Sequence, residues 1–207
     1  MKTAVVVASG PSLTKEDCEL VENSGIDVLV VNDCYKMIPS AKYIFACDIM
    51  WWIVHYESVP KSMLAYTLNV APVARKIVGA DKFLHELERT WDYGVYRQKV
   101  HHGGNSGYIA VQLAWQLGYD RLLLLGYDQK FAPDGKRHWF GDHDKKKFAK
   151  NADEVETWPN LLDRLIGDMI RYEHVDIVNC SRDTALTVPR RSTIDTELES
   201  WKHGKNE

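Results

Sequence analysis

The chain of 207 residues lacks several features that would assign it to a class at once. No run approaches the roughly 18 apolar residues of a membrane-spanning helix, so we expect no membrane partner. The cysteines form no CxxC pair and no zinc-binding pattern. They are Cys18, Cys34, Cys47 and Cys180. We interpret them as reduced core residues and therefore expect a cytoplasmic protein.

An excess of positive charge is also missing. The 26 lysines and arginines face 29 aspartates and glutamates, which gives a formal net charge of −3. This balance indicates no general surface for nucleic-acid phosphates, so a DNA or RNA contact would depend on local patches. The 45% of hydrophobic residues is ordinary for a globular protein, and we expect one domain over residues 1–207.

The glycine turn near the N-terminus matches neither standard nucleotide-binding pattern. Ser9-Gly10-Pro11-Ser12 is not GxGxxG, and no Walker lysine follows it. The apolar run before the turn is too short for a signal peptide, so we interpret it as the first strand of a mature protein. Glycine allows a ligand to approach the backbone, and the next helix presents N–H groups to an anion. A plain strand-to-helix connection explains the same residues.

Apolar, β-branched runs alternate with helical patterns along the chain. The expected strands cover residues 4–8, 27–32, 43–48, 62–67, 121–125 and 175–179. The expected helices cover residues 14–23, 50–57, 106–117 and 152–172, whereas the stretch from 72 to 99 fits no single pattern. This alternation predicts an α/β fold, with a Rossmann-like parallel sheet and helices on both faces. We expect a lid loop at about 129–152 and a polar C-terminal tail at about 182–207.

Small and polar residues follow the expected strands, where parallel sheets bind their ligands. These strand ends carry Ser9-Gly10, Asn32-Asp33, Asp48, Gly126-Tyr127-Asp128 and Asn179-Cys180-Ser181. A second glycine-rich segment, HHGGNSG, precedes the clearest helix, which Asn105 or Ser106 can cap. Its glycines would expose backbone donors to an anion, although a simple connector with an ordinary cap fits equally well.

The expected lid contains the segment HWFGDH, with His138, Asp142 and His143. Histidine titrates near neutral pH and suits general-base catalysis, but solvated loop histidines explain the pattern as well. The acidic residues Asp48, Asp128 and Asp142 can hydrogen-bond sugar hydroxyls or hold a divalent cation, and aspartate is also common in turns.

Four segments in order carry a family resemblance: VVVASGPSL, VVNDCYK, FACDIMWW and NSGYIAVQLAWQLGYDRLLLLGYD. Together they resemble the bacterial sialyltransferase-like enzymes of glycosyltransferase family 42, which sialylate lipooligosaccharide, and small phage and bacterial proteins of that superfamily. The similarity runs through most of residues 1–180 and is patchy between 60 and 100. It implies a Rossmann-like fold and a nucleotide-sugar donor as substrate, with no metal and no other cofactor.

The resemblance implies donor-binding roles for Ser9, Gly10, Asn32, Asp48, Ser106 and Gly107. To these we add their strand-end neighbours Pro11, Ser12, Asp33, Asn105, Gly126 and Asp128. Ser9 and Asp48 stand where the family has asparagines. Because Asp48 would repel an anionic sialic acid, a neutral hexose or pentose donor fits at least as well.

The general base stays open between three residues. The family's histidine motif points to His143, whereas counting back from the last strand gives Glu156. His138 falls at one of the family's two phosphate-binding tyrosines, and Ala132 at the other. We predict His143, His138 and Asp142 as the catalytic residues.

The acceptor and the class of activity also stay open. The acceptor can be a glycan, a small molecule or a modified nucleic-acid base, and a homo-oligomer is possible. One alternative is an ATP-dependent pyrophosphokinase like the pterin pyrophosphokinases, with magnesium on Asp48 and Asp128. Another is an accessory protein that binds nucleotide without turnover.

Overall fold

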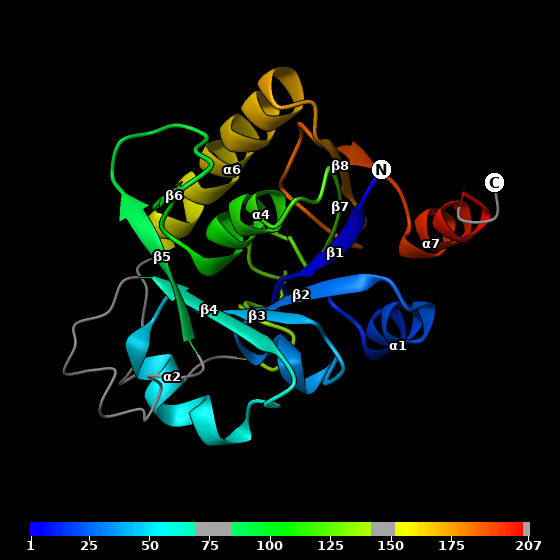
Figure 1. The fold of residues 1–207 in the computed structure, drawn as a ribbon, viewed down its shortest axis with the longest axis horizontal. Coiled ribbons are helices and arrows are strands. Elements are labelled where there is room, and N and C mark those ends of the chain that lie inside the picture. The colour runs from blue at the N-terminus through cyan, green and yellow to red at the C-terminus, as the bar shows by residue number, and fades with distance from the viewer. Residues whose placement is uncertain (69–83, 142–151, 205–207) are drawn as a thin grey trace.

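The computed structural model describes residues 1–68, 84–141 and 152–204, with side chains from residue 156 onward in the last range. The strands form a single parallel sheet in the order β6-β5-β4-β3-β2-β1-β7-β8-β9, of which Figure 1 labels β1 to β8. The strands are β1 (Thr3–Val7), β2 (Asp27–Val31), β3 (Tyr43–Phe45), β4 (Leu64–Leu68), β5 (Leu84–Thr90), β6 (Lys99–His101), β7 (Arg121–Leu125), β8 (Asp176–Asn179) and β9 (Arg190–Arg191). The helices are α1 (Lys15–Ser24), α2 (Ile49–His55), α4 (Ser106–Gln116), α6 (Ala152–Tyr172) and α7 (Ile194–His203), with 3₁₀ turns η1 (Asn32–Lys36) and η2 (Tyr56–Ser58).

The inner strands are apolar because both of their faces are covered. Val5 in β1 aligns with Val28 of β2 and with Leu123 of β7, and these side chains lie in the core. The chain proceeds outward from β1 to β6 and then returns to place β7 on the other side of β1. The strand order therefore reverses between β1 and β7, which is the switch point where parallel sheets bind ligands.

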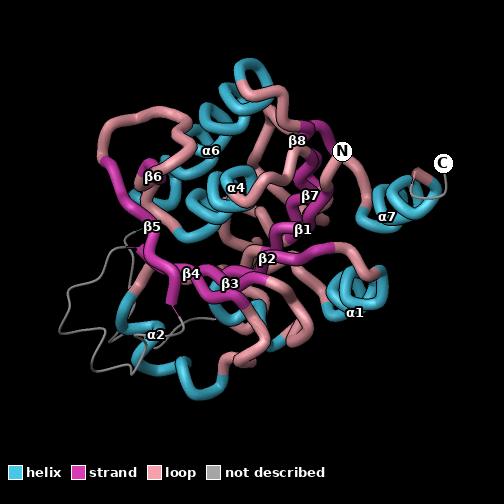
Figure 2. Tube along the Cα trace, in the orientation of Figure 1, coloured by secondary structure: helices cyan, strands magenta, loops and turns pink. Residues whose placement is uncertain are grey.

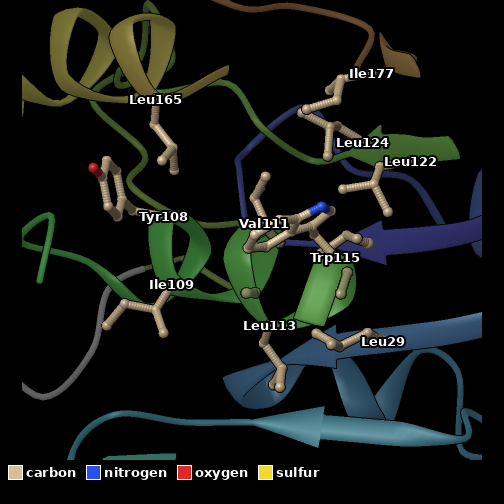
Figure 3. Packing of buried hydrophobic residues seen from close by; sticks show 14 of the residues in the cluster. Leu29, Tyr108, Ile109, Val111, Leu113, Trp115, Leu122, Leu124, Leu165 and Ile177 are labelled. Atoms are coloured by element: carbon tan, nitrogen blue, oxygen red, sulfur yellow. The ribbon is translucent and has the colours of Figure 1, made fainter. Parts of the chain in front are cut away.

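Helices cover both faces of the sheet. Helices α4 and α6 lie on one face, and α1, α2 and α7 on the other (Figures 1 and 2). Figure 3 shows α4 packed between the sheet and α6, with Leu113 near Leu29 of β2 and Tyr108 near Leu165 of α6. These layers confirm the predicted Rossmann-like α/β fold with helices on both faces.

The predicted helix boundaries follow from local capping. Thr14 accepts a hydrogen bond from the Asp17 N–H at 3.2 Å, and Gly25 ends α1 in the left-handed conformation with φ 74°. Asn105 accepts one from the Tyr108 N–H at 2.9 Å, and Gly118 follows α4 with φ 86°. Pro159 lies inside α6, which continues as a single helix through it.

The C-terminal segment differs from the expected polar tail, because it contains β9 and α7. Ile194 and Leu198 of α7 are buried beside α1, and the Glu197 carboxylate pairs with Arg121 and Arg190. The stretch left unassigned between 72 and 99 contains β5 and the start of β6. Of the expected lid, residues 129–141 form loop and turns with an isolated β-bridge between His138 and Gly141, and 142–151 lie outside the described residues. In the described parts of the chain, no helix is both long and apolar enough to cross a membrane.

Candidate functional site

The carboxyl ends of β1 and β7 meet so closely that two glycines are required there. The Gly10 N–H donates to the Gly126 carbonyl at 2.8 Å, and a Cβ on Gly10 would lie 2.5 Å from the same oxygen. Gly126 has φ 70°, and a Cβ there would overlap the Ala8 carbonyl. Gly10 and Gly126, two of the three glycines predicted to bind the donor, therefore serve the close approach of two backbones.

Asp128 stabilises the same junction of β1 with β7. Its carboxylate accepts the Ser12 N–H at 2.8 Å and the Ser12 hydroxyl at 2.9 Å, and the side chain is 2% exposed. Burial raises the pKa of Asp128 to about 6, against the lowering effect of the Ser12 hydrogen bonds. Ser12 and Asp128 are thus brought together as predicted, but their polar groups bind each other.

Ser9 and His138 meet at the end of β1, although 129 positions separate them in sequence. The Ser9 Oγ lies 3.0 Å from the His138 Nδ1, and the Trp139 N–H donates to the Ser9 carbonyl at 3.3 Å. The His138 ring stacks on Phe140, with ring centroids 5.0 Å apart and an interplanar angle of 12°. Both Ser9 and His138 are half-buried, so they lie at the boundary between core and solvent.

The first turn of α4 lies at the same edge of the sheet. The Ser106 hydroxyl donates to the Cys47 Sγ at 3.0 Å just after β3, and the Tyr127 hydroxyl donates to the Gly107 carbonyl at 3.0 Å just after β7. By helix geometry the N–H groups of Ser106 and Gly107 have no partner within α4. Together with the helix dipole they favour an anion at this end.

The segment before α4 is clamped onto the helix that it precedes. The Gln112 side chain accepts the His101 N–H at 2.9 Å and donates to the His101 carbonyl at 3.0 Å. The His101 Nδ1 lies 2.8 Å from the Tyr108 hydroxyl, and the Tyr108 ring fills the space where a Gly103 side chain would lie. Burial and the Arg164 charge lower the pKa of His101, which favours a neutral ring in this clamp.

Several buried polar atoms at this edge lack a hydrogen-bond partner within the described residues. They are Thr67 Oγ1 at the end of β4, Asn105 Nδ2 before α4, and Gln129 Oε1 after β7. Buried polar groups are nearly always paired, so each such atom calls for an explanation. Asn32 and Gln129, with φ of 49° and 52°, also hold the left-handed conformation that non-glycine residues rarely adopt. Unpaired groups and backbone strain of this kind cluster at ligand sites.

The structure gives no support for donor binding by three of the predicted residues, Asp33, Asp48 and Pro11. Asp33 is buried beside α2, where it accepts hydrogen bonds from Lys36 and from the Trp51 Nε1 at 3.0 Å. Burial acts to raise its pKa, but these hydrogen bonds outweigh it and hold the pKa below the usual value. Asp48 is exposed and caps α2 by accepting the Met50 N–H at 2.8 Å. Pro11 is half-buried in the turn after β1.

The predicted catalytic residues Asp142 and His143 lie outside the described residues, so their roles stay predictions. The other candidate base, Glu156, is exposed in α6. Among the residues that the structure describes, no three histidine, cysteine, aspartate or glutamate side chains gather to hold a metal ion.

Two residues at this edge were missed by the sequence analysis. Gln129 directly follows the predicted strand end at Asp128, so the strand-end pattern could have included it. Cys47 was assigned to the core, yet it is half-buried and contacts Ser106. A scan against protein-family models matches no family, and a search of curated proteins finds no matching sequence.

Proposed function

We propose that the protein is a glycosyltransferase that moves a sugar from a nucleotide-sugar donor to an acceptor hydroxyl. The observation that carries this proposal is the Ser9–His138 pair, with 3.0 Å between Oγ and Nδ1, at the β1–β7 switch point. An imidazole at this position can stabilise the charge on a leaving phosphate. The switch point of a parallel sheet is also where nucleotides bind.

The donor phosphate would rest against the first turn of α4. There the Ser106 and Gly107 N–H groups and the helix dipole favour negative charge. The unpaired Asn105 Nδ2 is a further donor beside them, although its burial means that a ligand would need a small side-chain movement to reach it. The clamp formed by Gln112 and Tyr108 holds this turn in place before any ligand arrives.

In the proposed reaction the acceptor oxygen bonds to the anomeric carbon, and the bond from that carbon to the donor phosphate breaks. The phosphate keeps the electron pair, and the acceptor proton passes to a base, for which His143 remains our choice ahead of His138 and Glu156. A Ser9 hydroxyl that donates to Nδ1 leaves the His138 proton on Nε2, from which the neutral ring can donate a hydrogen bond to the leaving phosphate and stabilise its charge.

Thermal-shift measurements with CMP, UDP, GDP, ADP and ATP, each with and without magnesium, test the donor class. Ligand binding raises the melting temperature by mass action, so we expect a shift with one nucleotide base and no need for magnesium. Turnover is then measured as nucleotide release from the matching nucleotide sugars with an acceptor mixture. We expect His138→Gln to lower turnover at least tenfold and to keep the nucleotide-induced shift, with His203→Gln at the exposed end of α7 as the matched control.

The same measurements can overturn the proposal. A magnesium-dependent shift with ATP alone would support the pyrophosphokinase alternative. Nucleotide binding without nucleotide release from any sugar donor would support an accessory protein. Unchanged turnover in His138→Gln would remove the role assigned to the Ser9–His138 pair.

A further inference from the structure

A largely exposed tryptophan lies at the same edge of the sheet as the proposed donor site. Trp91 directly follows β5 and is 67% exposed, and it is the one tryptophan among the exposed large hydrophobic residues of the described chain. Leaving such a large apolar ring in water gives up the free energy that its burial would supply. Isolated exposed apolar residues are common, so the surroundings of Trp91 decide whether it has a role.

The contacts of Trp91 connect it with the cap of α4. Its ring lies against the His102 ring, with centroids 4.7 Å apart and an interplanar angle of 43°. The His102 N–H donates to the Thr90 carbonyl at 3.0 Å, which joins the loops after β5 and β6. The His102 Nδ1 in turn accepts the Gly104 N–H at 3.4 Å, and Gly104 is followed by the cap residue Asn105. The exposed ring is thus held by a short series of contacts that ends at the proposed phosphate site.

We propose that Trp91, supported by His102, is the acceptor subsite and binds the ring of a neutral sugar. This inference rests on the proposed function, because an acceptor must reach the donor at this edge. The negative face of an aromatic ring attracts the polarised C–H groups of a pyranose. The Arg89 guanidinium lies over the Trp91 ring, 4.9 Å from its centroid, so a sugar that stacks on this face displaces it. The displaced guanidinium and the exposed Asp92 carboxylate then supply a donor and an acceptor for hydroxyl groups.

The charges around Trp91 favour a neutral sugar over a nucleic-acid acceptor, whose bases would also stack on tryptophan. The acidic residues Glu88 and Asp92 are exposed beside Arg89, and Lys99 aligns with Glu88 on the neighbouring strand β6, so these four charges balance. The whole chain carries a net charge of −3. A nucleic-acid strand needs cations along its phosphates, whereas a neutral sugar needs none.

Saturation-transfer NMR with the full chain, without nucleotide, tests the subsite. The probes are lactose, maltose and cellobiose, and a hexathymidylate oligonucleotide is measured separately. We expect at least one disaccharide to bind, Trp91→Ala to weaken its binding at least tenfold, and Trp91→Phe to retain most of it. Tyr172→Ala is the matched control, because Tyr172 is 65% exposed at the end of α6, away from this edge, and its loss should change nothing.

The inference is overturned if no disaccharide binds, if Trp91→Ala binds as tightly as the unmodified chain, or if only the oligonucleotide binds. The nucleotide thermal shift tests the donor proposal separately from the sugar subsite. The nucleotide thermal shift should be equal in Trp91→Ala and the unmodified chain. Disaccharide binding at Trp91 without any nucleotide shift would leave the sugar site standing and overturn the glycosyltransferase proposal.

Discussion

Replacement of Asp128 by asparagine should change how the stability of the protein depends on pH. Burial raises the pKa of this carboxyl from its usual value near 3.8 to about 6, because the side chain is 2% exposed. The native state therefore holds the Asp128 proton more tightly than the unfolded chain does. The stability that this proton contributes is fully present below pH 3.8 and is lost as the pH rises through about 6.

The size of the effect follows from the pKa difference. At about 1.4 kcal/mol for each pKa unit, a difference of about 2 corresponds to roughly 3 kcal/mol. Asparagine has nearly the same shape and can still accept the Ser12 N–H, but it does not ionise. From pH 4 to pH 7, the free energy of unfolding of Asp128→Asn should therefore rise by about 2–3 kcal/mol relative to that of the unmodified protein.

Urea unfolding at pH 4, 5, 6 and 7 and constant ionic strength measures this difference. The other carboxyls titrate alike in both proteins, so their contributions cancel. Asp134→Asn, at a side chain that is 63% exposed, is the control and should give a parallel pH profile. The reasoning would be refuted if the pH profile of Asp128→Asn ran parallel to that of the unmodified protein. It would also be refuted if Asp128→Asn lost stability toward pH 7 relative to the unmodified protein.

Two further predictions concern the scaffold. Gly10→Ala should lower the free energy of unfolding by about 2–4 kcal/mol, because its Cβ would lie 2.5 Å from the Gly126 carbonyl. Gly167→Ala, in an α6 position with room for a methyl group, should raise the free energy of unfolding by about 0.5–1 kcal/mol. Equal urea midpoints for the Gly10→Ala and Gly167→Ala variants would contradict both predictions. Glu197→Ala removes the buried partner of Arg121, which keeps its ion pair with Asp176, and should cost about 2–3 kcal/mol by urea unfolding. A cost below about 1 kcal/mol would show that Glu197 does not hold α7 in place.

The inner strands were predictable because burial on both faces leaves an uninterrupted apolar run, as in residues 121–125. Strand β5 has no such run. Its sequence LHELERT is polar and partly exposed, and its two leucines lie three positions apart, a spacing typical of a helix. The segment becomes a strand because it pairs with β4 and β6, and both partners lie outside the stretch of sequence from which its local pattern is judged. The helix α7 did have a local signal, since Ile194, Leu198 and Trp201 recur at helical spacing behind the cap residue Thr193.

The site shows the same division between local and long-range features. The cap at Asn105 was predictable because it depends on a hydrogen bond to Tyr108, three positions away. The pair of Ser9 with His138 was not, because only the fold brings the loop after β7 back to the end of β1. Sequence alone also offers no means of distinguishing a ligand-binding aspartate from one that joins two distant segments, as Asp128 does by binding Ser12.

Two parts of this edge hold its structure together: the junction of β1 with β7, and the first turn of α4. Variants in these parts should therefore behave differently from variants of the reacting groups. The β1–β7 junction depends on Gly10 and Asp128, whereas the α4 turn depends on the clamp between His101 and Gln112. A reacting group is effective when such a surrounding holds it before the substrate binds. A junction variant such as Gly10→Ala should therefore lose stability and nucleotide binding together. His138 contacts the junction through the Ser9 hydroxyl but holds neither backbone, so His138→Gln should lose turnover while the melting temperature of the free protein falls much less than in Gly10→Ala. A parallel fall in turnover and melting temperature in His138→Gln would assign this histidine to the scaffold.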